Sequence, residues 1–202
     1  TYAQLDAKAN RVANLLVEQG VEPGDRVGLF IPNTNQFPPA YFGIIRAGAV
    51  AVPLNLRMDP NTLGYVVNNS EADIVIASPV LADEAQNLAA ATDIGTLLLP
   101  GVTDDGVVNY SQALTDQPAE FDRPERDLGD IACQPYTSGT TGKPKGVLLS
   151  HENLLSAVEA YTKGGLAVDA DDSMVLVLPL FHIFALNAIM SVYLYKGGTM
   201  HL

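Results

Sequence analysis

The sequence predicts an α/β fold in which mainly parallel sheets carry helices on both faces. Short, almost continuously apolar segments alternate with longer segments whose apolar residues recur at helical spacing. Strands that are apolar throughout are typical of parallel sheets covered on both sides. The composition agrees, because 48% apolar and 17% charged residues in a chain of 202 describe an ordinary globular protein.

The first part of the chain follows this alternation from its start. Thr1 and Gln4 have the spacing of a capping box, which opens a helix that ends near Gly20. Asp59 directly before Pro60 is typical of another helix start. Helices are expected over 1–20, from Pro39 to about Gly48, from Asp59 to about 70, over 80–92 and over 110–116. Strands are expected from 25 to Pro32, over 49–55, 72–78 and 95–101.

The second part of the chain begins after a surface linker, predicted over 116–130 from its two prolines and six acidic residues. We take 1–202 as one partial domain, in which 131–202 forms the segment after the linker. Its strands are expected over 130–136, 146–151, 173–180 and 199–202, and the one over 173–180 is expected to be buried. Its helices are expected over 151–165, with Ser150 as N-cap, and over 184–198.

The charge balance excludes some partners. Acidic residues outnumber basic ones by 23 to 11, giving a net charge of −12, so no nucleic-acid partner is expected. No apolar run is long enough for a transmembrane segment, and the N-terminus lacks the pattern of a signal peptide. The single cysteine, Cys133, cannot form a disulfide within the chain and is predicted to be buried and inert rather than a nucleophile. A reducing cytoplasm fits this composition.

The segment "YTSGTTGKPKG", residues 136–146, is unusually polar and follows an apolar strand. Its glycines allow backbone N–H groups to converge on an anion, hydroxyl groups add donors, and Lys143 and Lys145 add positive charge. It is not a Walker A motif, because Pro144 follows Gly142-Lys143 and position 137 is threonine. It also lacks a Rossmann glycine pattern. The segment is therefore suited to binding a polyphosphate. The alternative interpretation, a surface loop that binds no ligand, stays open.

The longer string "YTSGTTGKPKGVLLSHENL" resembles the phosphate loop of the adenylate-forming (AMP-binding) superfamily. "LVLPLFHIFAL", "GAVAVPLNLR" and the opening "TYAQLDAKANRVANLLVEQGVEPGDRVGLFIPNTNQF" resemble further segments of the same enzymes, so the resemblance runs from Thr1 to Leu202. It implies the N-terminal half of the large domain of an acyl-CoA synthetase, specifically a fatty-acid–CoA ligase. Such enzymes use ATP and Mg²⁺ to convert a carboxylic acid into an acyl-adenylate, and coenzyme A then displaces AMP.

The resemblance also implies site residues. His182 is expected near the substrate carboxylate; without the resemblance, a histidine that caps a helix start would be the preferred interpretation. Thr140 is expected to contact Mg²⁺ as well as phosphate. The residues expected around the β- and γ-phosphates are Thr137, Ser138, Gly139, Thr140, Thr141, Gly142, Lys143 and Lys145, with Lys143 the less certain of the two lysines because the family varies there.

Other candidate residues carry weaker signals. His151 is expected to have a structural role in the first turn of a helix, and His201 is uninformative. The three aspartates in 169–173 lack the glycine and glutamate of an EF-hand and are expected to form a solvated turn. Ala185 stands where many members of the family carry glycine, and its methyl group could reshape the acyl tunnel.

Two classes of function stay open. The first is an N-terminal fragment of an acid–thiol ligase, inactive alone, whose interrupted domain exposes apolar surface and is expected to self-associate. Its substrates would be a small carboxylic acid and coenzyme A. The second is a non-catalytic α/β module that binds a nucleotide or phosphate.

Overall fold

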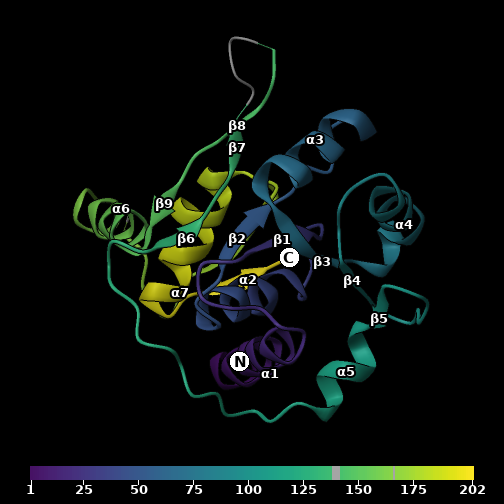
Figure 1. The fold of residues 1–202 in the computed structure, drawn as a ribbon. Coiled ribbons are helices and arrows are strands. Elements are labelled where there is room, and N and C mark those ends of the chain that lie inside the picture. Colours follow the sequence, from purple (N-terminus) through teal and green to yellow (C-terminus); the bar gives the residue numbers. More distant parts are fainter. Residues whose placement is uncertain (138–141, 166) are drawn as a thin grey trace.

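The computed structural model describes residues 1–137, 142–165 and 167–202. At its centre is a seven-stranded sheet with the order β5-β4-β3-β1-β2-β6-β9, in which every pair is parallel except β6–β9 (Figure 1). Two further pairs are the parallel strands β10–β11 and the antiparallel hairpin β7–β8. The predicted fold class, mainly parallel sheet with helices on both faces, is confirmed.

The elements have the following bounds. The helices are α1 Tyr2–Glu18, α2 Phe37–Arg46, α3 Pro60–Ser70, η1 Pro79–Leu81, α4 Ala82–Ala90, α5 Tyr110–Asp116, α6 His151–Lys163, the π-helix η2 Phe184–Ser191 and α7 Val192–Lys196. The strands are β1 Arg26–Phe30, β2 Val50–Pro53, β3 Ala72–Ala77, β4 Thr96–Leu99, β5 Val107–Asn109, β6 Ile131–Cys133, β7 Tyr136–Thr137, β8 Lys145–Gly146, β9 Leu149–Ser150, β10 Ser173–Val175 and β11 Thr199–His201.

The sheet has an apolar core on each face, as expected when the central strands are mainly apolar. In β3, Ile74 and Ile76 join the cluster that also contains buried residues of α1 and α2. Val75 and Ala77, which alternate with them, join the cluster that contains buried residues of α3 and α4. Helices α1 and α2 pack closely, because a Cβ at Gly43 would lie 2.4 Å from the Cβ of Val12.

Local sequence signals fix several helix starts. The capping box of α1 forms, with Thr1 and Gln4 exchanging hydrogen bonds. Asp59 caps α3 and Ser150 caps α6 through their side chains. The start of α2 was predicted too late: the helix begins at Phe37 and accommodates both prolines in its first turn, where an amide hydrogen is not needed.

The strand expected over 173–180 is wrong in length, and its expected burial holds only for Leu176 and Leu180. Strand β10 has only three residues, and the side chain of Val177 beyond it is 80% exposed. Within the described residues, β10 pairs only with the equally short β11, and of its side chains Met174 packs against the core while Val175 is 66% exposed. Strand β5 was not predicted, because its three residues are too few to give a periodic signal.

Residues 117–130 contain neither helix nor strand and pass around α1 (Figure 1). Side-chain amides of α1 hold this segment by its backbone. Asn10 Nδ2 donates to the carbonyl of Ala119 at 2.8 Å, and Asn14 Nδ2 donates to the carbonyls of Pro118 at 3.1 Å and Glu120 at 2.9 Å. In the described part of the chain, none of the helices combines the length and hydropathy that crossing a lipid bilayer requires.

Candidate functional site

The polar segment singled out in the sequence forms the hairpin β7–β8, which projects from the body of the molecule (Figure 1). Thr137 pairs with Lys145 and Tyr136 pairs with Gly146. Residues directly opposite in an antiparallel pair carry their side chains on the same face, so Thr137 and Lys145 are neighbours. Gly142 has φ of 98°, a left-handed conformation that suits glycine.

The base of the hairpin packs against helix α3 through Tyr136. The Tyr136 hydroxyl donates to Asn69 Oδ1 at 2.9 Å and accepts from Gln134 Nε2 at 3.2 Å. Burial raises the pKa of Tyr136, which keeps this hydroxyl protonated and able to donate. A Cβ at Gly146 would lie 2.5 Å from Gln134 Nε2 and 3.0 Å from Tyr136 Cζ, so a side chain there would have to displace both. These contacts fix where the hairpin leaves the body.

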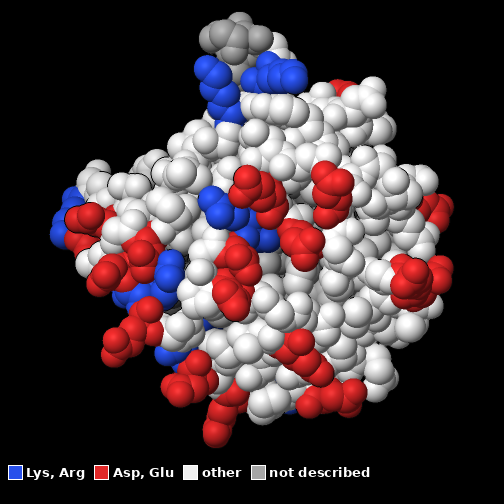
Figure 2. All heavy atoms as spheres, viewed as in Figure 1, with Lys and Arg blue, Asp and Glu red and all other residues white. Residues whose placement is uncertain are grey.

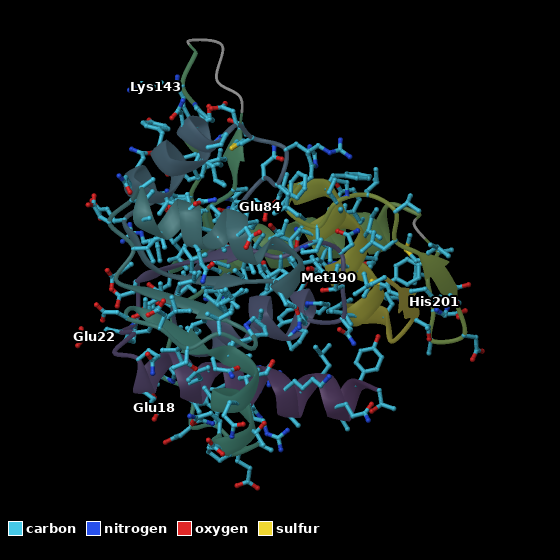
Figure 3. The ribbon with its side chains drawn as sticks, turned by 90° about the vertical axis from the view of Figure 1, so that its right-hand side faces the viewer. Glu18, Glu22, Glu84, Lys143, Met190 and His201 are labelled. Carbon is cyan, nitrogen blue, oxygen red and sulfur yellow. The ribbon has the colours of Figure 1, made fainter. Side chains whose placement is uncertain are left out.

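Both lysines of the hairpin are exposed and carry the positive charge at this end of the molecule (Figure 2). Figure 2 also shows acidic side chains spread over the remaining visible face, as a net charge of −12 requires. Within the described residues neither lysine forms a salt bridge. Lys143 Nζ lies 4.9 Å from the centre of the Tyr65 ring of α3, a cation–π contact, and extends from the hairpin (Figure 3). The hairpin therefore offers uncompensated cationic charge to an anion.

Four of the expected site residues lie outside the described residues: Ser138, Gly139, Thr140 and Thr141. The expected Mg²⁺ contact of Thr140 is among them. In the described remainder, no group of three or more His, Cys, Asp or Glu side chains is placed to hold a metal ion. The described members of the expected phosphate site, namely Thr137, Gly142, Lys143 and Lys145, all belong to one hairpin.

His182 lies at the start of the π-helix η2 and is exposed. Its carbonyl accepts from the amide of Leu186 at 3.0 Å, and its ring Nδ1 accepts from the amide of Phe184 at 3.2 Å. An Nδ1 that accepts requires the neutral ring to carry its hydrogen on Nε2. The side chain therefore has a capping contact, and its Nε2–H remains able to bind a ligand. Among the described contacts, none joins His182 to the hairpin lysines.

The remaining sequence candidates have structural positions. His151 is the first residue of α6, and burial, with Arg126 second, lowers its pKa. Asp169 and Asp172 form a hydrogen-bonded turn. Ala185 is fully buried in the core cluster that contains α1 and α2. Cys133 is fully buried, and burial raises the pKa of its thiol to about 12, so it is inert as expected.

Sequence reasoning missed the residues that hold the candidate site in place. Tyr65 and Asn69 lie four residues apart on α3, so they share one face of that helix. This spacing was readable, but nothing in the sequence indicates that the hairpin packs on this particular face. Asn33, which follows β1, was missed for the same reason: its partners are 143–147 residues away.

An open α/β sheet with a cationic, glycine-containing hairpin is the architecture of a protein suited to an anionic ligand. The family model described as "AMP-binding enzyme" matches residues 1–202, and the chain belongs to this family. It is 36% identical over 191 residues to the long-chain-fatty-acid–CoA ligase FadD13 of Mycobacterium tuberculosis, covering 94% of this chain and 37% of that protein. It is 31% identical over 205 residues to 4-coumarate–CoA ligase 2 of Nicotiana tabacum, covering 99% of this chain and 37% of that protein.

The fold agrees with solved structures of the same kind. ATP-bound MatB from Rhodopseudomonas palustris superposes with a TM-score of 0.84 at 34% identity, covering 98% of this chain and 39% of that one. The chain spans 37% of the length of the first curated relatives it matches. The resemblance to the N-terminal part of acid–CoA ligases is thereby confirmed.

Proposed function

We propose that the full-length protein is an ATP-dependent acid–thiol ligase that activates a carboxylic acid, specifically a fatty acid, and transfers the acyl group to coenzyme A. The observation that carries this proposal is the β7–β8 hairpin, which presents Lys145 beside Thr137 without an acidic partner among the described residues. Its membership of the AMP-binding family supplies the reaction class.

The proposed reaction has two steps. A carboxylate oxygen attacks the α-phosphorus of ATP, and the bond to the leaving pyrophosphate breaks. The sulfur of coenzyme A then attacks the acyl carbon, its proton is lost, and the bond to AMP breaks. Both steps move negative charge on phosphate oxygens, so cationic side chains and amide donors are the main contribution the protein makes.

In this proposal the hairpin binds the β- and γ-phosphates of ATP. Lys145 and the hydroxyl of Thr137 approach the phosphates from one face of the hairpin, and Gly142 allows the turn. Lys143 leaves Tyr65 to join them, because a phosphate attracts an ammonium more strongly than an aromatic ring does. Ser138, Gly139, Thr140 and Thr141 complete the proposed loop.

Mg²⁺ is the metal proposed for this reaction, with the hydroxyl of Thr140 as its contact. When bound, it would neutralise charge on the triphosphate. Hydroxyl oxygens suit a hard cation of this kind.

His182 is proposed to lie beside the substrate carboxylate. Its Nε2–H is the donor left after Nδ1 accepts from Phe184. A neutral N–H donor can orient a carboxylate without adding a charge that must later be removed.

A fatty acid is the proposed substrate because of the 36% identity to FadD13, which is named a long-chain-fatty-acid–CoA ligase. Ala185, which is fully buried, is proposed to influence the shape of the acyl site through its methyl group. We propose the cytoplasm as the compartment, which suits a protein whose one cysteine is a buried free thiol.

The test is a panel of carboxylic acids with the full-length protein. AMP release would be measured with dodecanoate, palmitate, 4-coumarate and malonate, each with and without coenzyme A. Release that depends on a fatty acid and rises with coenzyme A supports the proposal. If AMP is released only with 4-coumarate or only with malonate, a fatty acid is not the substrate, and the substrate class must be changed to that of the active acid. Nucleotide binding without AMP release from any acid would favour a non-catalytic nucleotide-binding module instead.

A further inference from the structure

One side chain fastens the segment that precedes His182. Asn33 Nδ2 donates to the carbonyls of Leu178 at 2.7 Å and Leu176 at 3.2 Å, and Asn33 Oδ1 accepts from the amide of Leu180 at 2.8 Å. Both amide hydrogens and the carbonyl oxygen of the side chain are therefore used. No other side chain among the described residues makes as many hydrogen bonds to this segment.

The segment 176–182 needs such partners. It lies between β10 and η2 and belongs to neither a strand nor a helix, so most of its backbone groups, apart from the amide of Leu176 that donates to the carbonyl of His201, have no regular ladder to join. Leu176 and Leu180 are almost completely buried, with exposed fractions of 3% and 0%. Polar backbone groups beside buried side chains are costly when unpaired, and Asn33 satisfies two of them, the carbonyl of Leu176 and the amide of Leu180.

Asn33 occupies a specific place in the sheet. It follows β1 by three residues, at the carboxyl end of that strand. The neighbouring strands β1 and β3 send their connections in opposite directions, through α2 towards β2 and through α4 towards β4. Ligands of open α/β sheets bind outside the carboxyl ends of strands at such a point. Asn33 therefore joins the central sheet to the second strand pair where a ligand is expected.

The fastened segment leads directly to His182. The amide of His182 donates to the carbonyl of Pro179 at 3.0 Å, so the histidine backbone is held by the same turn that Asn33 holds. The ring of His182 is then oriented by the amide of Phe184. An unbroken series of hydrogen-bonded groups therefore runs from Asn33 through 176–180 to the imidazole.

We propose that Asn33 is a positioning residue, which holds the 176–180 segment so that the His182 ring faces the substrate carboxylate. The inference rests on the proposed function in assigning His182 that role. It is independent of the phosphate hairpin, because Asn33 contacts no residue of β7 or β8 among the described hydrogen bonds.

The test uses full-length Asn33→Ala and Asn33→Asp, with Asn14→Ala as the matched control. The side-chain amide of Asn14 also donates to three backbone carbonyls, but those carbonyls belong to α1 and to residues 117–130. We expect Asn33→Ala to lower kcat for acid-dependent AMP release about 10- to 100-fold, the effect of a misplaced reacting group. The KM for ATP should stay within about twofold. Asn33→Asp keeps the acceptor for Leu180 but turns a carboxylate oxygen towards two carbonyl oxygens, so it should lower kcat at least as much as Asn33→Ala. Asn14→Ala should keep the kcat of the unsubstituted protein.

A double-substitution cycle separates positioning from a general structural effect. If Asn33 acts through His182, adding Asn33→Ala to His182→Ala should cause no further loss of kcat. The inference would be overturned if the double variant lost kcat by the product of the two single losses. It would also be overturned if Asn14→Ala lost as much kcat as Asn33→Ala.

Amide hydrogen exchange provides a readout that does not need activity. Asn33→Ala should remove protection at Leu180, His182 and Phe184 while leaving β3 and β4 protected. Unchanged protection at these three amides would also overturn the inference. If the unsubstituted protein releases no AMP with any acid, the proposed function fails, and the exchange measurement still decides whether Asn33 positions the segment.

Discussion

The hydroxyl of Tyr136 donates a hydrogen bond of 2.9 Å to Oδ1 of Asn69, and this contact joins the base of the hairpin to helix α3. The two residues are 67 positions apart in the chain. Tyr136 also accepts from Gln134, whose side chain is buried. The exposed hairpin is therefore anchored by a partly buried polar network rather than by apolar packing alone.

Removing that hydroxyl should loosen the hairpin. Tyr136→Phe loses one donated and one accepted hydrogen bond, so we expect the free energy of unfolding to fall by about 1–2 kcal/mol. The KM for ATP should rise severalfold, because the phosphate loop is less well placed. Denaturant unfolding and ATP titration of the full-length protein measure both effects. Tyr161→Phe is the control, and equal behaviour of the two variants would show that the network does not anchor the loop.

A methyl group at position 146 should have a larger effect. In Gly146→Ala the new Cβ meets the buried Gln134 amide and the Tyr136 ring, both of which must move. We expect a loss of about 1–3 kcal/mol in the free energy of unfolding, the usual range for overpacking. Gly129→Ala is the matched control, because a Cβ there meets nothing within 4 Å. Similar unfolding midpoints for both variants would contradict the packing argument.

The two lysines of the hairpin should contribute unequally to ATP binding. Lys143 contacts the ring of Tyr65 and must leave it to bind phosphate, whereas Lys145 has no such contact among the described residues. A cation–π contact at an exposed site is worth about 0.5–1 kcal/mol. Losing this contact offsets part of the binding free energy that Lys143 gains from the phosphate. We expect Lys145→Ala to raise the KM for ATP more than Lys143→Ala does. The reverse order in steady-state kinetics would reject this assignment.

The buried thiol of Cys133 should make the free energy of unfolding decrease measurably as the pH rises into the alkaline range. The pKa of Cys133 is raised by burial from 9.0 to about 12, so its contribution is fully present below pH 9 and is lost as pH rises towards 12. Between pH 8 and 10 the unfolding free energy should fall by about 1 kcal/mol less in Cys133→Ala than in the unsubstituted protein. Parallel curves would refute the shift. A thiol reagent at pH 8 should react only after unfolding.

The sequence predicted what local chemistry determines. Capping residues such as Asp59 and Ser150 act within three residues of themselves, so the starts of α3 and α6 could be read directly. Apolar runs predicted most strands of the central sheet, though not the three-residue β5, because strands buried on both faces carry few polar residues. The segment 136–146 was visible as a polar loop because glycines, hydroxyl groups and lysines are concentrated in a few positions, but its pairing as the hairpin β7–β8 was not predicted.

What the sequence did not predict depends on contacts between distant segments. The burial of 173–180 was overestimated, since an apolar run does not reveal whether another layer covers it. Tyr65, Asn69 and Asn33 act through partners 67 to 147 positions away in the chain. Side-chain amides that bind distant backbone groups leave no periodic pattern in a single sequence.

The hairpin is proposed to hold the triphosphate of ATP while an organic acid is adenylated. The most direct measurement is the acid-dependent exchange of pyrophosphate into ATP by the full-length protein that carries Lys145→Ala together with Thr140→Val. We expect the exchange rate to fall about a hundredfold, as when groups that stabilise developing charge are removed. Lys163→Ala, which changes an exposed lysine paired with Glu159, is the control and should leave the rate unchanged. Exchange at the unsubstituted rate in the Lys145→Ala, Thr140→Val protein would contradict the account.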